Sequence, residues 1–172
     1  MNIYVVQVST GEEEKFLKLW ESQKVGRNVN VYWPKREIII RRQGKTVKSI
    51  APVFPGYVFV EADEIDDSTF YEFKKVPYFH RFLKDNLNII PLPDSEQRVI
   101  FQLTKFGKVI GRSTVTYNQN DKIVVLDGPL KGLDGLIVKV DKRKKRVKVR
   151  LNMYEDSFLV DFAYELIEGK EE

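Results

Sequence analysis

Apolar and polar positions follow two different periods along the chain, and these periods predict its elements. Residues 3–8 form an almost continuous apolar run, which is typical of a central strand. Over residues 13–23, apolar side chains recur at Phe16, Leu19 and Trp20, the spacing of one buried helix face. The chain therefore opens with a strand and an amphipathic helix.

Two β-rich runs come next, over residues 29–42 and 46–60, and Gly44 between them is suited to a hairpin turn. Three further elements follow: a short helix capped by residues 66–68, a strand over residues 78–83 and a third helix after Asp94. The order β-α-β-β-α-β-α contains the split βαβ pattern of ferredoxin-like domains.

The helix ends also carry signals. The pairs Thr10 with Glu13 and Asp94 with Gln97 have capping-box spacing. Gly26 is placed to end the first helix.

The apolar period is lost over residues 105–120, which contain two glycines and no acidic residue, and we interpret them as a linker. Short strands are then predicted over residues 122–126, 136–141, 146–151 and 158–162. About 50 residues of short strands suit a small SH3-like barrel. We therefore predict an α+β protein with three parts: a ferredoxin-like domain over residues 1–104, a linker over 105–120 and a barrel over 121–172.

Composition excludes several classes of function. Hydrophobic residues make up 42% and charged residues 31%, so a packed core is feasible. The chain has no cysteine, and its one histidine, His80, cannot build a multi-histidine metal site. His80 lies in a predicted strand without the context of a nucleophile, and no phosphate-binding glycine motif occurs. We predict no catalytic residues, no metal and no cofactor, so the protein is not expected to be an enzyme.

The sequence also carries no apolar run near the roughly 20 residues that span a membrane. Its first residues, MNIYVVQVSTGEEEKF, lack the basic start and cleavage site of a signal peptide. We expect a soluble cytoplasmic protein that acts as a monomer.

Charge is unevenly distributed. The whole chain carries only +4, but residues 131–150 carry +7 and residues 151–172 carry −6. Strand alternation over residues 146–151 places Val147, Val149 and Leu151 on one face, so the charged residues between them share the other. This basic ridge, suited to phosphates, consists of Lys142, Arg143, Lys144, Lys145, Arg146, Lys148 and Arg150. The alternative is a hairpin that is merely solvated.

A second basic cluster lies in the predicted hairpin over residues 35–48, and its candidate phosphate contacts are Arg41, Arg42 and Lys45.

The segment VFPGYVFV, residues 53–60, suggests a different surface. Pro55 and Gly56 set a bend inside an aromatic run. Core packing explains Val58 and Val60. With helices on only one face of the sheet, however, Tyr4, Phe54 and Tyr57 are expected to form an exposed apolar patch, which commonly marks a protein contact.

Four segments in order resemble the NusG family of transcription elongation factors: YVVQVSTGEEEKF, VFPGYVFVEA, VPYFHRFLKDNLNIIPLPDSE and NDKIVVLDGPLKGLDGLIVKVDKRKKRVKV. The first three are similar to the family's N-terminal (NGN) domain, and the fourth to the KOW motif of its C-terminal barrel.

The resemblance implies docking on the clamp helices of the largest catalytic subunit of RNA polymerase, which favours processive elongation. The family's contact segment maps onto Phe54, Pro55, Gly56 and Tyr57, with Tyr4 beside it.

Two departures point away from the general factor. The stretch MYEDSFLVDF stands where the general barrel contacts the termination factor Rho or a ribosomal protein, and its altered pattern argues against both contacts. Lys75 and Val76 replace the Asn-Thr pair with which some members read the non-template DNA strand.

The main hypothesis is a specialised antiterminator similar to the LoaP branch, whose basic KOW domain contacts a nascent RNA hairpin and touches DNA in the elongation complex. In the RfaH branch the C-terminal domain instead folds as a helical hairpin, which the period-two pattern here disfavours. Two alternatives stay open: a general elongation factor that couples polymerase to Rho or the ribosome, and a ribosome-associated RNA-binding protein.

Overall fold

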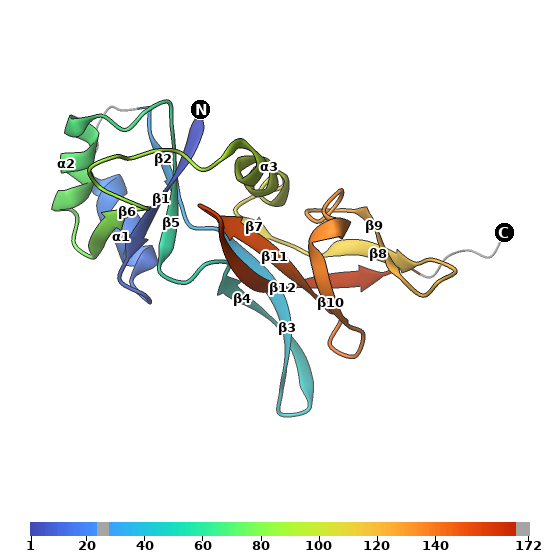
Figure 1. Ribbon diagram of the computed structural model, residues 1–172. Helices are drawn as coiled ribbons and strands as arrows, with labels where there is room; N and C mark the ends of the chain where they lie inside the picture. Colours follow the sequence, from blue (N-terminus) through green and yellow to red (C-terminus); the bar gives the residue numbers. More distant parts are fainter. Residues whose placement is uncertain (24–27, 168–172) are drawn as a thin grey trace. The chain divides into compact units, whose positions relative to one another are not determined.

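The computed structural model describes residues 1–23 and 28–167 (Figure 1). The predicted helix stop at Gly26 lies outside these residues. The chain divides into two compact units. The N-terminal unit contains residues 1–34 and 54–97, and the C-terminal unit contains residues 35–53 and the chain from Arg98 onwards.

The N-terminal unit is built on a four-stranded sheet of order β2-β5-β1-β6, in which every neighbouring pair is antiparallel. Its strands are β1 (Asn2–Val8), β2 (Asn30–Tyr32), β5 (Tyr57–Ala62) and β6 (Phe79–Phe82), and its two helices are α1 (Glu13–Ser22) and α2 (Asp67–Lys75). This order of elements confirms the ferredoxin-like pattern.

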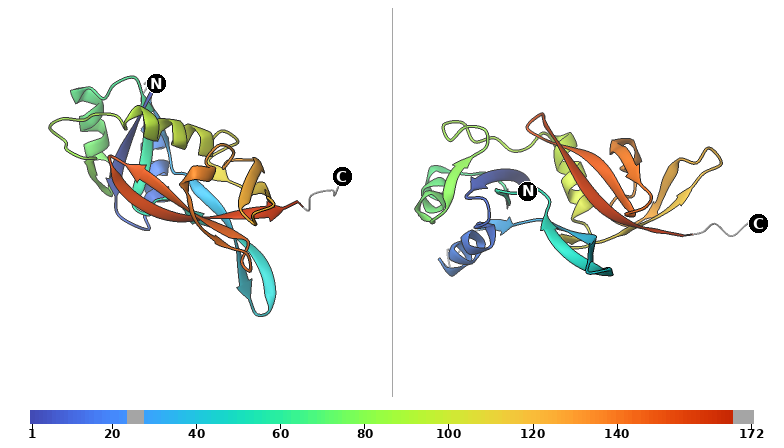
Figure 2. Two further views of the ribbon diagram at one scale, coloured as in Figure 1. Left: turned by 45° about the vertical axis from the view of Figure 1, so that its right-hand side comes forward. Right: turned by 90° about the horizontal axis from the view of Figure 1, so that it is seen from below.

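One face of this sheet packs against both helices (Figures 1 and 2). Phe16 of α1 and Phe73 of α2 are fully buried, and the ring of Trp20 stacks on Phe73 at a centroid distance of 3.9 Å. Alternate residues of β1, Tyr4 among them, supply the sheet side of this core. Phe16 and Trp20 of the predicted stripe therefore pack as expected, whereas Leu19 is exposed and the neighbouring Leu17 packs against the core instead.

The helix starts differ from the expected pattern in two of three cases. Asp66 caps α2 as predicted, because its Oδ1 accepts a 2.7 Å hydrogen bond from the backbone N–H of Thr69. Helix α1 begins only at Glu13, so Thr10 lies too early to form a capping box. Helix α3 (Asp94–Leu103) begins at Asp94 itself, and the Gln97 side chain donates to the carbonyl of Leu92 at 2.7 Å.

The C-terminal unit contains a long hairpin that the sequence patterns assigned to the N-terminal domain. Each β-rich run divides into two strands, because Pro34 and the Pro55–Gly56 bend interrupt the ladders. The hairpin strands are β3 (Lys35–Arg42) and β4 (Lys45–Pro52), and β7 (Val109–Ile110) joins β3 in parallel. The predicted turn at Gly44 is confirmed: Gln43 and Gly44 have φ of 50° and 75°, typical of a two-residue hairpin loop.

A five-stranded sheet of order β10-β11-β12-β8-β9 forms the rest of the unit. Its strands are β8 (Ser113–Tyr117), β9 (Ile123–Asp127), β10 (Ile137–Asp141), β11 (Arg146–Met153) and β12 (Asp156–Leu166), and a 3-10 turn, η1 (Asp134–Leu136), precedes β10. The C-terminal residues thus form strands and not a helical hairpin. The fold is α+β, as predicted.

The stretch over residues 105–120 is not an irregular linker. It contains β7 and β8, and β8 pairs in parallel with the end of β12. Ser113 and Val115 are fully buried in this pairing. Both strands are so short that their few apolar residues do not form a recognisable alternating pattern among the polar residues around them.

Candidate functional site

The bend at residues 54–57, which we call the Pro55 turn, is held by one backbone hydrogen bond to the end of β1 and one within the turn. The carbonyl of Gly56 accepts from the N–H of Val8 at 2.8 Å, and the N–H of Tyr57 donates to the carbonyl of Phe54 at 3.2 Å. Gly56 has a φ of 83°, and a Cβ there would lie 2.8 Å from Thr10 Oγ1. Only glycine fits this position without strain.

A buried carboxylate fixes the same turn from the helix side. Glu13 is only 2% exposed, and its Oε1 accepts from the N–H of Gly56 at 2.7 Å. Its Oε2 accepts from the N–H of Gly11 at 2.9 Å. Glu13 lies in the first turn of α1, where the helix dipole favours a negative charge. Glu13 therefore joins α1 to the Pro55 turn, a role that the capping-box interpretation missed.

The expected exposed aromatic patch is only partly present. Tyr4 is 4% exposed because it shares the helix-covered face of β1, and Phe54 is 1% exposed and packs edge-on against Phe59. The prediction that these two rings are exposed is therefore wrong. Pro55 is exposed and Tyr57 is half-buried. Of the five predicted contact residues, these two present side chains to solvent.

The predicted alternation along β11 is confirmed. Val147, Val149 and Leu151 are buried, whereas Arg146 and Lys148 are half-buried and Arg150 is exposed. The turn between β10 and β11, residues 142–145, is fully exposed. The basic ridge thus lies on a packed apolar strand.

Two cations of this ridge are already paired. Lys142 Nζ lies 2.8 Å from Asp121 Oδ2 and 4.5 Å from the centroid of the Tyr117 ring. The hydrogen bond to Asp121 raises the pKa of Lys142. Lys148 Nζ lies 3.9 Å from Asp161 Oδ1 on the neighbouring strand. These residues have less charge available for a ligand.

The remaining cations of the turn have no such partner. Among residues 1–23 and 28–167, no carboxylate forms a salt bridge with Arg143, Lys144 or Lys145. The turn is shaped by Asp141, whose Oδ1 accepts from the N–H of Lys144 at 2.9 Å, and this bond lowers the pKa of Asp141. Lys145 completes it with a φ of 52°.

Within the C-terminal unit, the β3–β4 hairpin and the β10–β11 turn line one groove, which we call the basic groove. Its volume is about 470 Å³. Its lining residues come from two segments about 100 residues apart in sequence: Ile39, Ile40, Arg41 and Thr46, and Arg143, Lys144, Lys145 and Arg146. Arg42 and Lys45, at the hairpin tip, and Lys148 and Arg150, further along β11, do not line it.

Two arginines join the β3–β4 hairpin to the five-stranded sheet. Arg146 donates from Nη2 to the carbonyl of Ile39 at 2.6 Å, and Arg36 donates from Nη1 to the carbonyl of Asp161 at 2.6 Å. Burial lowers the pKa of Arg36, and the nearby Arg146 lowers it further, against the opposing effect of Asp161. The sequence placed Arg36 in a basic cluster but gave no sign of this contact, because it crosses between distant strands.

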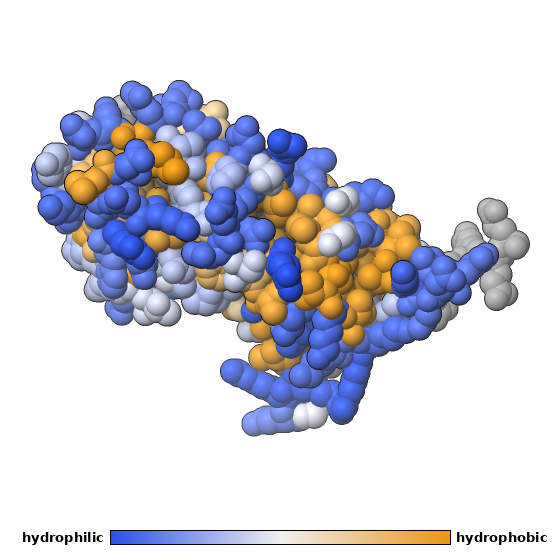
Figure 3. Space-filling view, viewed as in Figure 1, coloured by the Kyte–Doolittle hydropathy of each residue, from blue (hydrophilic) through white to orange (hydrophobic). Residues whose placement is uncertain are grey.

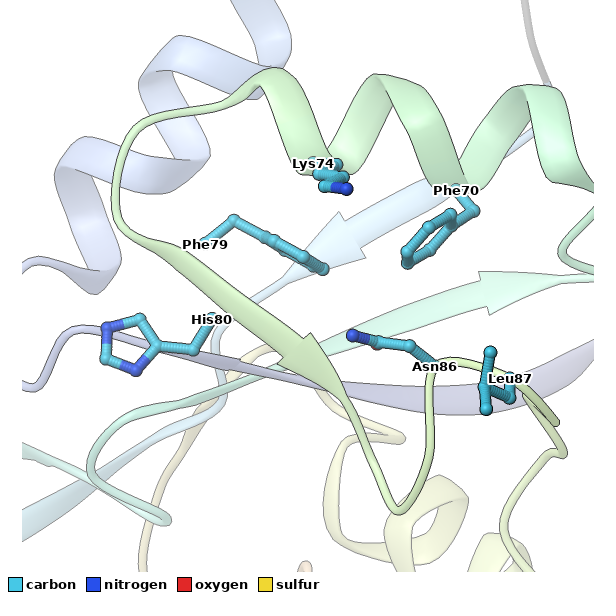
Figure 4. Close-up of a pocket in the computed structure, with 6 residues that line it drawn as sticks. All are labelled: Phe70, Lys74, Phe79, His80, Asn86 and Leu87. Carbon is cyan, nitrogen blue, oxygen red and sulfur yellow. The ribbon is translucent and has the colours of Figure 1, made fainter.

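His80 is exposed on β6, and its Nε2 lies 2.9 Å from Ser9 Oγ. It also lines an open pocket of about 480 Å³ in the N-terminal unit, between α2 and the chain after β6 (Figure 4). The described residues contain no cluster of three or more groups able to hold a metal, and none of their helices is long and apolar enough to cross a membrane.

The C-terminal unit also carries exposed apolar side chains that the sequence patterns did not identify. Figure 3 shows a hydrophobic area over its five-stranded sheet. Exposed residues of this unit include Leu126, Val138 and Leu159. Each has an apolar neighbour in its strand, so the alternation of apolar and polar residues does not show which of the two is buried and which is exposed.

Comparisons with known proteins fit this architecture. The family described as transcription termination factor nusG matches residues 1–101. The transcription termination/antitermination protein NusG of Buchnera aphidicola subsp. Acyrthosiphon pisum is 27% identical, over 96% of this chain and 94% of its own length. The protein of that name from Haemophilus influenzae is 28% identical, over 96% of this chain and 92% of its own length. A solved structure of Thermotoga maritima NusG has the same fold, with a TM-score of 0.56, 24% identity, and coverage of 94% of this chain and 93% of its own.

Proposed function

Because the chain belongs to the NusG family of transcription factors, we propose that it is an antiterminator that binds RNA polymerase and nascent RNA through separate surfaces. Proteins of this family are not enzymes, and neither is this chain. The observation that carries the RNA part is that Arg143, Lys144 and Lys145 form no salt bridge within the part of the chain that the structure describes. We further propose that the protein acts in the cytoplasm.

The polymerase contact belongs to the Pro55 turn. Its backbone is fixed by Gly56 and Glu13 before any partner arrives, so little conformational entropy is lost on binding. The exposed Pro55 and half-buried Tyr57 are the residues that touch the clamp helices of the largest subunit, whereas Tyr4 and Phe54 are buried within the fold.

The RNA contact belongs to the KOW motif, and its proposed ligand is a hairpin of the nascent transcript. Phosphate binding by solvated cations supplies affinity without large buried area. Carboxylates already occupy Lys142 and Lys148, which supports Arg143, Lys144 and Lys145 as the principal contacts. We keep residues 1–104 and 121–172 as the two functional domains of this proposal.

We assign the protein to the LoaP-like branch over the general factor because of the turn between β11 and β12. Tyr154 and Glu155 form it with φ of 49° and 72°, and Tyr154 is buried. Glu155 in this turn and Asp156 directly after it are acidic, and they do not match the segment with which the general factor contacts Rho or the ribosome.

The test is transcription in vitro with purified RNA polymerase across an intrinsic terminator, with and without candidate leader RNAs upstream. We expect read-through to rise only when both the protein and a recognised leader are present. A variant with Arg143→Ala and Lys144→Ala should lose this leader-dependent increase. Read-through that is identical on every leader would instead identify a general elongation factor.

A further inference from the structure

We propose that the basic groove binds an unpaired segment of RNA, with the β3–β4 hairpin and the β10–β11 turn acting as one site. This inference rests on the proposed function, because it takes the RNA contact as given. It adds Arg41, from a distant part of the chain, and it specifies that the groove takes an unpaired part of the RNA hairpin, its loop or a flanking strand, and not the duplex stem.

Charge is the first argument. Arg41 faces the same groove as Arg143 and Lys144, and in the described part of the chain none of the three forms a salt bridge. Cations held together without counterions attract a polyanion, and they release its condensed ions on binding. The desolvated Arg36 and its neighbour Arg146, which lines the groove, add positive potential.

The second argument is that the two walls are fixed to each other. The hydrogen bonds from Arg146 to the Ile39 carbonyl and from Arg36 to the Asp161 carbonyl run in opposite directions between the hairpin and the five-stranded sheet. Strands β3 and β12 also lie beside each other in this unit. The groove is therefore pre-formed, and a strand bound there contacts both walls at once.

Size and lining argue for a single strand. A volume of about 470 Å³ lies within the range of roughly 300–1,000 Å³ that holds a small ligand, so the groove admits individual nucleotides and not the width of a duplex. Ile39 and Ile40 supply an aliphatic wall beside the cations. An unpaired base or ribose has an apolar face to place there, whereas the bases of a duplex are stacked inside it.

The experiment measures binding of the full-length protein to a fluorescent uridine oligonucleotide of about eight nucleotides, at several salt concentrations. The variants are Arg41→Ala, Lys144→Ala and the two combined. Arg98→Ala is the matched control, because Arg98 is an exposed arginine of the same C-terminal unit that does not line the groove. Thermal unfolding of each variant verifies that it is folded.

We expect Arg41→Ala and Lys144→Ala each to weaken binding about threefold and to lower the slope of log K against log salt by about 0.7. Arg98→Ala should leave both the affinity and the salt slope unchanged. An RNA duplex of equal charge should bind more weakly, with no dependence on Arg41.

Two results would overturn the proposal that the groove binds unpaired RNA. One is an Arg41→Ala variant that behaves like Arg98→Ala while Lys144→Ala still weakens binding, which leaves the proposed RNA function intact at the turn alone. The other is an equal Arg41 effect on the duplex. Absence of RNA binding by the unaltered protein, or no effect of Lys144→Ala, would instead remove the proposed function itself.

Discussion

The Pro55 turn and the β10–β11 turn are both short loops proposed to bind a partner, yet they are stabilised in opposite ways. The first is anchored inside the fold, through the buried carboxylate of Glu13 and a glycine that admits no side chain. The second is anchored at its two ends, by Asp141, by the salt bridge of Lys142 with Asp121 and by the Lys145 carbonyl, which accepts from the N–H of Tyr164. The side chains of Arg143 and Lys144, between these ends, are exposed. Substitutions at the first turn should therefore cost stability, and substitutions at the second should cost binding alone.

The largest effect is expected for Glu13→Ala. It leaves the buried N–H of Gly56 without its acceptor, which costs about 1–3 kcal/mol, and it also removes the hydrogen bond from the N–H of the exposed Gly11. We expect the free energy of unfolding, measured in urea, to fall by about 2–4 kcal/mol. Glu14→Ala is the control, because Glu14 is exposed and its salt bridge is with Lys18 on the surface of α1. Equal losses for both variants would show that the buried carboxylate does not hold the turn.

Gly56→Ala should come next, at about 2–3 kcal/mol, because it combines an unfavourable φ with a close approach to Thr10. Gly44→Ala separates the two causes. Gly44 has a φ of 75° but nothing within 4 Å of a Cβ, so it should cost only about 1 kcal/mol. Adding Thr10→Ala to Gly56→Ala should recover part of the difference, and no recovery would contradict the contact with Thr10.

The Pro55 turn and the basic groove also show how much of the structure could be predicted from the sequence. The bend at Pro55 and Gly56 was predictable, because proline and glycine have strong local preferences. The burial of Tyr4 and Phe54 was not, since it depends on which face of β1 the helices cover and on the packing of Phe54 against Phe59. The basic ridge was predictable from the alternation of apolar and charged residues along β11. The basic groove was not, because its lining residues come from segments far apart in the chain.

Arg146→Ala tests a residue that lies next to the exposed β10–β11 turn but is itself anchored to the β3–β4 hairpin. Arg146 begins β11 beside the solvated turn, but its hydrogen bond to the Ile39 carbonyl ties it to the hairpin. We expect a loss of about 1–2 kcal/mol in unfolding free energy. Arg150→Ala, on an exposed position of the same strand, should stay within about 0.5 kcal/mol of the unaltered protein. An unchanged stability for Arg146→Ala would mean that the hairpin is not tied to β11.

The smallest effect concerns pH. The hydrogen bond from the Lys144 N–H lowers the pKa of Asp141 in the folded protein. Asp141 therefore contributes stability above its ordinary pKa of about 3.9, and this contribution is lost as pH falls through the lower folded value. Asp141→Asn should slightly reduce the acid dependence of the unfolding midpoint below about pH 4. A steeper acid dependence in the variant would contradict the assigned direction.

The central claim is that the Pro55 turn serves polymerase and the β10–β11 turn serves RNA. Its most direct test measures both affinities, for purified RNA polymerase and for leader RNA, in two variants: Tyr57→Ala, and Arg143→Ala with Lys144→Ala. The account predicts a crossed result, in which Tyr57→Ala weakens only polymerase binding and the double variant weakens only RNA binding. A variant that weakens both affinities equally, or the opposite crossing, would contradict it.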